Sequence, residues 1–438
     1  MPFTLVDEAI HSLDTLEEPW SIQLELRLAG HLEEARLRAA MVEALRRYPM
    51  ARVRLVPPRR LDRRHWWEIT PESELDPLRV VDCPDEAALL AVRSELQSLR
   101  VPLVESPPIR ARLARHPGGD LIMFNVNHVA FDGFGALRVM HSVARAYAGR
   151  SDPPPPVPLE DARDIRGHLA TDDLAVRVPR WRMLAGKLRD LVSSPARLAC
   201  DQGADRPGYG FHHLRLSVDD TAALSDPELP VTVNDLLVAA LHLAVASWNA
   251  GHVARSRRIG VLVPVNLRPK GWRQDMVTNF SLPARVVTSP RDRATPRQAL
   301  DAVAAQGERA RGPAGAALVE VLGRIPSLST LPASSRNRLG DTALLSNLGL
   351  IEPPSFGPDA GETTELWFSA PAQMPAGSHS ARPPSPGNSI WPFAIDTRCS
   401  VLRQSVGSPT ATYSSFTGSA RKPGRQAVRL HTTARNHQ

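Results

Sequence analysis

The sequence predicts an α/β protein of two lobes joined by a stiff linker. Helical and strand-like patterns alternate in both halves of the chain, which is typical of α/β architecture. At 151–158 the segment SDPPPPVP interrupts these patterns, and proline-rich segments form extended spacers. The 438 residues are enough for two separate cores. We therefore expect a first lobe at 1–150, a linker at 151–165 and a second lobe at 166–377.

In the first half, apolar residues at helical spacing predict helices over 31–48, 85–96 and 133–149. Asp85 is suited to cap the second of these. Alternating or continuous apolar runs predict strands over 51–56, 65–70, 109–116 and 121–128. On the first helix, the residues expected to face the core are Leu32, Leu37, Ala40, Val42 and Leu45.

In the second half, the same criteria predict a long apolar helix over 233–249 and further helices over 296–310 and 314–324. Strands are expected over 258–267, 279–287, 342–347 and 364–370. Beyond about Gly377 the patterns stop, and Ser, Thr, Pro, Gly and Arg dominate. One interpretation of 378–438 is a disordered basic tail.

The other interpretation of the tail is a shift of the reading frame. In the shifted frame, each new codon consists of the third base of one printed codon and the first two bases of the next. The printed amino acids largely fix the latter two bases, so only the third-position base of the printed codon is free. With mostly G or C as the free base, 375–406 can be re-read to contain QLHLAFRYRH, an alternating strand. The segment that follows becomes LADRYLLELH, an amphipathic helix. The re-read strand and helix could both pack in a hydrophobic core, whereas residues 378–438 as printed match no core-forming pattern.

Charge and cysteine content narrow the functional class. The tail holds eight Lys or Arg residues and one acid, which accounts for the whole net charge of +7. The rest of the chain has no basic bias, so we expect no nucleic-acid partner. Three widely spaced cysteines, Cys83, Cys200 and Cys399, form no metal-ligand pattern, and we expect a reduced, cytoplasmic protein without a metal. The sequence shows no signal peptide and no apolar run long enough to span a membrane.

The segment NHVAFDG at 127–133 carries the strongest chemical signal. A buried strand ends at Asn127 and His128, and a tight turn through Asp132 and Gly133 leads into a helix. Transfer of an acyl group from a thioester requires a base of near-neutral pKa, which histidine supplies. We expect Asp132 to bind a cation and brace the turn, and Gly133 to let the backbone turn close beneath the imidazole. The alternative is a structural histidine beside a turn.

This segment resembles the HHxxxDG signature of the condensation-domain and chloramphenicol-acetyltransferase superfamily. That superfamily includes condensation domains of nonribosomal peptide synthetases, polyketide-associated and alcohol acyltransferases, and wax ester synthase/diacylglycerol acyltransferases. Four further segments are similar to family motifs and occur in the family's order. They are TVNDLLVAALHLAVASW from 232, VPVNLRP at 263–269, TNFSLP at 278–283 and SNLG at 346–349. The first histidine of the signature is Asn127 here, and Thr278 replaces a family glycine.

The resemblance implies two chloramphenicol-acetyltransferase-like lobes in a V, with an active-site tunnel between them. His128 would be the general base, and Arg268 would pair with Asp132. Asn279, Ser346 and Asn347 are candidates for lining the tunnel or contacting the acceptor, and ordinary strand-end capping is the alternative. The protein would bind no cofactor or metal. Its co-substrate would be acyl-CoA or the phosphopantetheine thioester of an acyl carrier protein.

We therefore expect a monomeric acyltransferase that acts on a small-molecule hydroxyl or amine in lipid or secondary metabolite biosynthesis. The competing hypothesis is a catalytically impaired relative that acts as a binding module, which Asn127 and the aberrant tail favour. No nucleophile elbow, P-loop or dinucleotide fingerprint occurs, so other common enzyme classes lack support. We interpret Trp66 and Trp67 as strand residues that pack on a helix beside a solvated basic turn.

Overall fold

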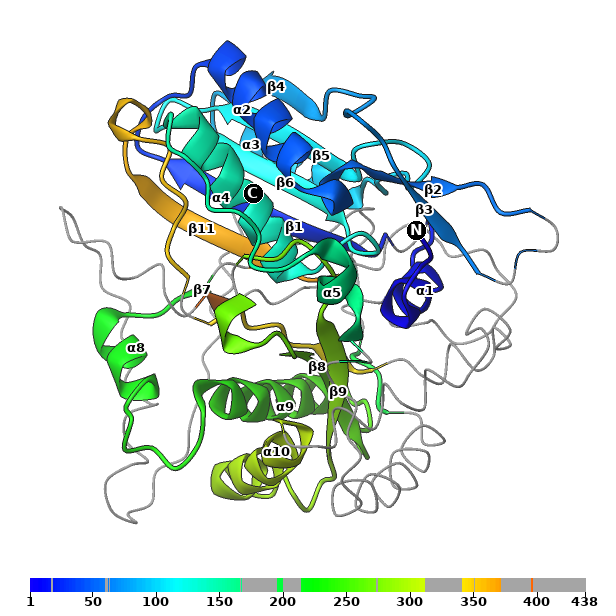
Figure 1. Cartoon of the computed structure of the whole chain (residues 1–438). Coiled ribbons are helices and arrows are strands. Elements are labelled where there is room, and N and C mark those ends of the chain that lie inside the picture. The colour runs from blue at the N-terminus through cyan, green and yellow to red at the C-terminus, as the bar shows by residue number, and fades with distance from the viewer. Residues whose placement is uncertain are drawn as a thin grey trace.

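The computed structural model describes most of the chain up to residue 371. The described ranges are 1–165 without 17–18, 60–61 and 63, then 167, 195–199, 214–311 without 273–274, 341–371 without 350, and 395–396. Helices and strands alternate in both halves, and two lobes lie one above the other in Figure 1. The predicted α/β fold is therefore confirmed. The predicted helix at 314–324 and nearly all of the 378–438 tail lie outside the described residues.

The first lobe is centred on a five-stranded sheet in the order β11-β1-β6-β5-β4. Its pairs are antiparallel except for β4 and β5, which run parallel. The central strand β6 is buried at every position, because helices cover both faces of the sheet. The strands are β1 (Ser21–Leu28), β4 (Leu78–Asp82), β5 (Ile109–Arg115), β6 (Leu121–Asn127) and β11 (Thr363–Ser369).

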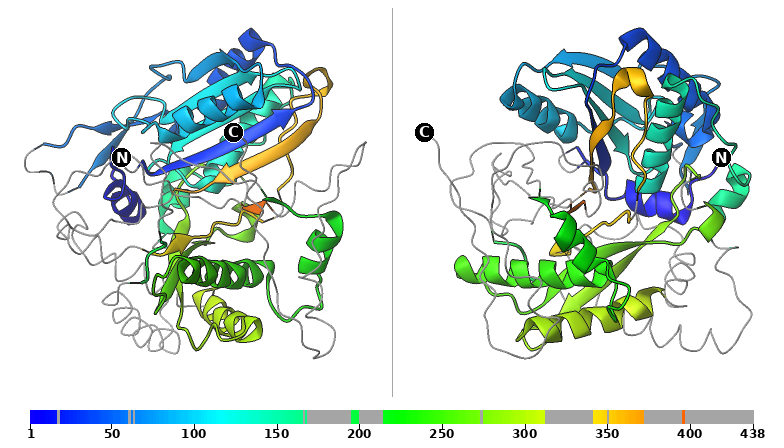
Figure 2. Two further views of the ribbon diagram at one scale, coloured as in Figure 1. Left: turned by 180° about the vertical axis from the view of Figure 1, so that it is seen from behind. Right: turned by 90° about the vertical axis from the view of Figure 1, so that its left-hand side faces the viewer.

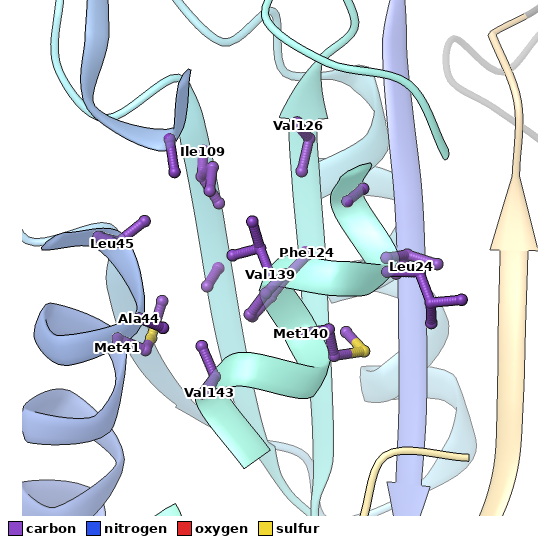
Figure 3. Close-up of a cluster of buried hydrophobic side chains, with 14 of the residues drawn as sticks. Leu24, Met41, Ala44, Leu45, Ile109, Phe124, Val126, Val139, Met140 and Val143 are labelled. Atoms are coloured by element: carbon purple, nitrogen blue, oxygen red, sulfur yellow. The ribbon is translucent and has the colours of Figure 1, made fainter. Parts of the chain in front are cut away.

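Helices α2 (Glu34–Arg47) and α4 (Gly133–Tyr147) pack together on one face of this sheet. Figure 3 shows how Met41 of α2 and Val139 of α4 meet sheet residues such as Phe124. The prediction that Val42 faces the core is wrong, since its side chain is 56% exposed. It lies about 100° around the helix from Met41, which is buried in its place.

Helix α3 (Glu86–Ser98) covers the opposite face of the sheet, as the view from behind in Figure 2 shows. The predicted cap is confirmed, because the Asp85 carboxylate accepts a hydrogen bond from the Ala88 N–H at 2.8 Å. Cys83 is buried as a free thiol between α3 and the sheet.

Beside the sheet lies a two-stranded ribbon of β2 (Val53–Val56) and β3 (Trp66–Ile69), preceded in the chain by α1 (Leu5–His11). The interpretation of the two tryptophans is half right. Trp67 is buried, stacks on Phe3 at 4.3 Å between ring centroids, and donates its indole N–H to Asp7 of α1. Trp66 is 46% exposed.

The second lobe contains α9 (Val233–Gly251) and α10 (Pro296–Arg311) packed against β8 (Ile259–Asn266) and β9 (Ser281–Thr288). These elements lie in the lower half of Figure 1, and β10 (Ala343–Leu344) pairs with β8. Smaller elements are α5 (Leu159–Arg163), α8 (Val218–Leu224), and the pair of β7 (Leu214–Arg215) with β12 (Ile395–Asp396).

One strand from the second half of the chain completes the sheet of the first lobe. β11 pairs antiparallel with β1, and both Figure 1 and Figure 2 show these strands side by side. The range 166–377, expected from the sequence to form the second lobe, thus contains an edge strand of the first-lobe sheet. Within the described residues, no helix combines the length and apolar character needed to cross a membrane.

Candidate active site

His128 is the first residue after β6, where the buried strand meets a tight turn. Its backbone N–H donates to the Trp20 carbonyl at 3.0 Å, and the Ala130 N–H closes the turn on the Asn127 carbonyl. His128 is partly exposed, whereas Asn127 and Val129 on either side are buried. The strand end therefore places a partly exposed histidine between two buried neighbours.

Asn127, which replaces the first histidine of the resembled signature, holds this turn in place. Its amide NH2 donates to the Asp14 carboxylate at 3.1 Å and to the Val101 carbonyl at 2.9 Å. Its side-chain oxygen accepts from the Val129 N–H at 3.0 Å. Asn127 is fully buried. The residue at this position thus supports the backbone around His128.

Asp132 is the centre of the polar network at the site. It caps α4 by accepting from the Gly135 N–H at 3.1 Å. The Arg268 guanidinium donates to both of its carboxylate oxygens, at 2.7 and 2.8 Å, which confirms the predicted ion pair. The Phe280 N–H and the Ser281 hydroxyl each donate at 3.0 Å. One carboxylate therefore binds groups from both lobes.

The electrostatic consequence is a carboxylate that stays ionised. Burial acts to raise the pKa of Asp132, but the Arg268 charge and the hydrogen bonds outweigh it, and the pKa lies below its usual value. The Arg268 side chain is fully buried and also donates to the Thr278 carbonyl at 2.7 Å. Because Asp132 is saturated by these donors, it braces the turn and is not available as a base.

Gly133 is required for close packing with the second half of the chain. A Cβ at this position would meet the Phe368 ring of β11 at 2.9 Å and the Leu348 side chain at 3.2 Å. Sequence reasoning placed the need for glycine beneath His128, but the close neighbours that the structure shows are these two apolar side chains. Leu348 lies in the predicted SNLG segment, which this contact brings to the start of α4.

The predicted substrate-contacting residues lie in two places. Asn279 is buried and donates its amide NH2 to the carbonyls of His128, at 3.0 Å, and Val129, at 2.8 Å. Ser346 and Asn347 are partly exposed, and the Asn347 side-chain oxygen accepts from the Gly349 N–H at 2.9 Å. Asn279 therefore contacts the His128 turn directly, whereas Ser346 and Asn347 are connected to it through Leu348.

Burial lowers the pKa of His128 below its usual value. The Asp132 charge, two backbone carbonyls and the Asn279 amide act in the opposite direction and only partly offset the effect of burial. Its Nδ1 atom is buried without a hydrogen-bond partner among the described residues. At neutral pH the imidazole is uncharged, which is the protonation state that a general base needs.

Sequence reasoning missed two buried acids of the N-terminal segment. Asp14 accepts from Asn127 and from Arg100, and Asp7 accepts from Asn279 at 3.4 Å. The signal that could have found Asp7 is local: Thr4 and Asp7 form a capping box, which marks the start of α1. The described residues contain no cluster of His, Cys, Asp or Glu suited to a metal ion.

Comparison with solved structures identifies the class of fold. The first condensation domain of the calcium-dependent antibiotic synthetase, solved with a substrate analogue, has a TM-score of 0.64 at 16% identity, and the match covers 85% of each chain. The EpoB cyclization-docking bidomain from Sorangium cellulosum has a TM-score of 0.57 at 14% identity, covering 85% of this chain and 75% of that one. The protein therefore has the condensation-domain fold, as the sequence motifs predict.

Comparison with other protein sequences identifies a relative that matches most of the chain. The uncharacterized protein Rv2305 of Mycobacterium tuberculosis is 33% identical over 385 residues, covering 85% of this chain and 88% of that protein. This chain belongs to the same family as Rv2305. A probable nonribosomal peptide synthetase of Salinispora arenicola, CymA, is 27% identical over 211 residues, or 44% of this chain and 3% of CymA. No protein-family model matches the chain.

Proposed function

We propose that this protein is an acyltransferase with His128 as its general base. It would move an acyl group from a thioester, carried by coenzyme A or by the phosphopantetheine arm of a carrier protein, to a hydroxyl or amine acceptor. One observation carries the proposal: a partly exposed histidine, whose pKa is lowered by burial, stands at the end of β6 in a turn that Asp132 and Arg268 hold between the lobes.

The chemistry follows from that geometry. His128 takes the proton of the acceptor hydroxyl or amine while the acceptor attacks the thioester carbonyl. The new bond joins the acyl carbon to oxygen or nitrogen, the carbon–sulfur bond breaks, and the proton passes from the imidazole to the departing thiol. The two products are an ester or amide and a free thiol. Asp132 and Arg268 contribute by holding the turn that places His128.

The similar proteins support a thioester donor on a carrier. CymA is a probable nonribosomal peptide synthetase, and the solved condensation domain belongs to an antibiotic synthetase. For this chain we propose that Ser346 and Asn347 contact the substrate. Both are partly exposed, and Leu348 beside them packs close to Gly133 at the start of α4.

The test is thiol release from acyl-CoA and from an acyl-loaded carrier protein, each offered with alcohol and amine acceptors. We expect His128→Ala to lose the activity almost completely. His31→Ala is the matched control, because the His31 side chain is 64% exposed in the first lobe and outside the network at the site. Equal rates from the wild type and His128→Ala would reject the proposal.

The competing function is a thioester-binding relative that transfers nothing. The replacement of the first signature histidine by Asn127 favours it, whereas the three hydrogen bonds of Asn127 favour an intact turn. A non-hydrolysable acyl-CoA analogue separates the two functions. Tight binding by a wild-type protein that releases no thiol from any donor would favour the binding module.

We propose further that 378–438 is the product of a shifted reading frame. The shifted frame supplies a strand and an amphipathic helix, whereas the written residues match no core-forming pattern. Sequencing the DNA around the codon for Gly377 tests this directly. We expect one base too many or too few, and an uninterrupted reading of the printed frame would reject it.

A further inference from the structure

The Asp14 carboxylate, in the loop between α1 and β1, binds three different segments of the chain. Its oxygens accept from the Trp20 N–H at 2.9 Å, from Nε of Arg100 at 3.0 Å and from the Asn127 amide at 3.1 Å. The Asp14 side chain is fully buried, whereas Arg100 is partly exposed. The Arg100 charge compensates that of the buried carboxylate, which leaves two uncharged partners to explain.

Both of these uncharged partners bind the backbone of the turn that carries His128. The carbonyl of Trp20 accepts from the His128 N–H at 3.0 Å. The side-chain oxygen of Asn127 accepts from the Val129 N–H at 3.0 Å. Asp14 is therefore one residue removed from two consecutive backbone N–H groups of the turn, one through Trp20 and the other through Asn127.

The bond to Asp14 also explains why asparagine suits position 127. The Asn127 side chain donates twice, to the Asp14 carboxylate and to the Val101 carbonyl at 2.9 Å, and accepts once from the Val129 N–H. A neutral imidazole offers one donor and one acceptor, and an imidazolium offers two donors and no acceptor. Histidine, which the resembled signature has at this position, could not make all three bonds in either protonation state.

We propose that Asp14 is a positioning residue for His128 and acts through Trp20 and Asn127. None of its described contacts reaches the imidazole, so its effect passes through the backbone of the turn. A catalytic group displaced by about 1 Å loses up to about 10²-fold in rate. The proposal rests on the proposed function, because the placement of His128 matters for catalysis only if His128 acts as the base.

Backbone hydrogen exchange of the full-length protein, followed by NMR, tests the support of the turn without any substrate. In the wild type we expect slow exchange at the amides of His128 and Val129. Asp14→Asn keeps the size of the side chain but leaves one acceptor oxygen in place of two. Both amides should then exchange faster, whereas Phe124 in the middle of β6 should not change. In the thiol assay kcat should fall by about 10-fold to 10²-fold, with little change in KM.

Glu25→Gln is the matched control, because it makes the same carboxylate-to-amide change at another buried acid paired with an arginine. Glu25 is 7% exposed and accepts from Arg93 at 2.5 and 2.6 Å, away from the turn. It should keep the wild-type exchange at both turn amides and the wild-type kcat per folded molecule. An equal fall of kcat in both variants would assign the effect to a general loss of stability and overturn the proposal.

Reversing the two partners tests their direct coupling. In the double variant Asp14→Asn with Asn127→Asp, the amide at 14 can donate to the carboxylate at 127, which still accepts from the Val129 N–H. We expect the double variant to regain part of the kcat that each single variant loses. Losses that simply add would overturn the coupling. Asn127→His should lower kcat, and a gain would overturn the proposal by identifying Asn127 as a defect.

The wild-type protein tests the proposal even if the Asp14 variants do not fold, since rapid exchange at the amides of His128 and Val129 would overturn it alone. Failure of the proposed function is distinguishable from failure of this proposal. Thiol release that survives in His128→Ala rejects His128 as the base, whatever the exchange rates of the turn are.

Discussion

Two buried ion pairs of similar geometry have different expected roles in this molecule. Glu25 of β1 and Arg93 of α3 form a bidentate pair at 2.5 and 2.6 Å, within the first lobe. Asp132 and Arg268 form another at 2.7 and 2.8 Å, between the lobes. Breaking either pair leaves a buried charge, so both matter for stability. Only the second lies on the turn that carries His128, so only it should matter for catalysis.

The surroundings of the two pairs also differ. Asp132 receives further hydrogen bonds from both lobes, and Arg268 has no second carboxylate among its described partners. Arg93 has two further acids close enough to raise its pKa, Glu86 and Glu365. The charge of Arg93 is therefore partly balanced without Glu25. We therefore expect the same carboxylate-to-amide substitution to cost a different amount of unfolding free energy at each of the two pairs.

The largest effect is expected for Asp132→Asn. It leaves the Arg268 charge uncompensated in a fully buried position, which costs about 3–5 kcal/mol of unfolding free energy. It also loosens the turn, so thiol release should fall strongly. Urea unfolding and the thiol assay measure the two effects. A soluble, well-folded variant with undiminished activity would remove Asp132 from the proposed role.

A smaller effect is expected for Glu25→Gln, the same carboxylate-to-amide change at the other pair. It should cost less unfolding free energy than Asp132→Asn, because Glu86 and Glu365 remain near Arg93. Activity per folded molecule should match the wild type, since β1 and α3 do not touch the His128 network at this pair. A loss of thiol release comparable to that of Asp132→Asn would show that the Glu25–Arg93 pair also matters for catalysis, against this prediction.

The two pairs also show what the sequence can and cannot predict. Asp132 was predictable, because a buried strand, a turn and an apolar helix follow one another within a few residues of it. Its partner Arg268 was predicted through a family motif and is confirmed. The bond between Asn279 and Asp7 spans 272 positions and has no local pattern. Long-range pairing of this kind also determines that β11 joins the first-lobe sheet, which periodicity alone does not reveal.

The smallest effect is the dependence of stability on pH, and it compares two histidines outside the active site, a half-buried one in the first lobe and a buried one in the second. Burial lowers the pKa of His141 in α4 and of His242 in α9 to about 4. Both are neutral in the folded protein and take up a proton near pH 6.5 when it unfolds. The unfolded state therefore binds more protons below pH 6.5, and stability should fall as the pH drops from 6.5 toward 4.

The variant His242→Gln measures how much of this pH dependence of stability comes from the histidine of the second lobe. His242 is fully buried and bonds the Thr288 hydroxyl through Nδ1 at 2.7 Å, with Arg293 also lowering its pKa. One proton corresponds to a slope of at most about 1.4 kcal/mol per pH unit, and the variant should lose part of that slope. Urea unfolding at pH 7 and pH 5 measures it. Since Gln cannot take up the proton, an identical loss of stability in variant and wild type would show that His242 is not among the groups that destabilise the fold in acid.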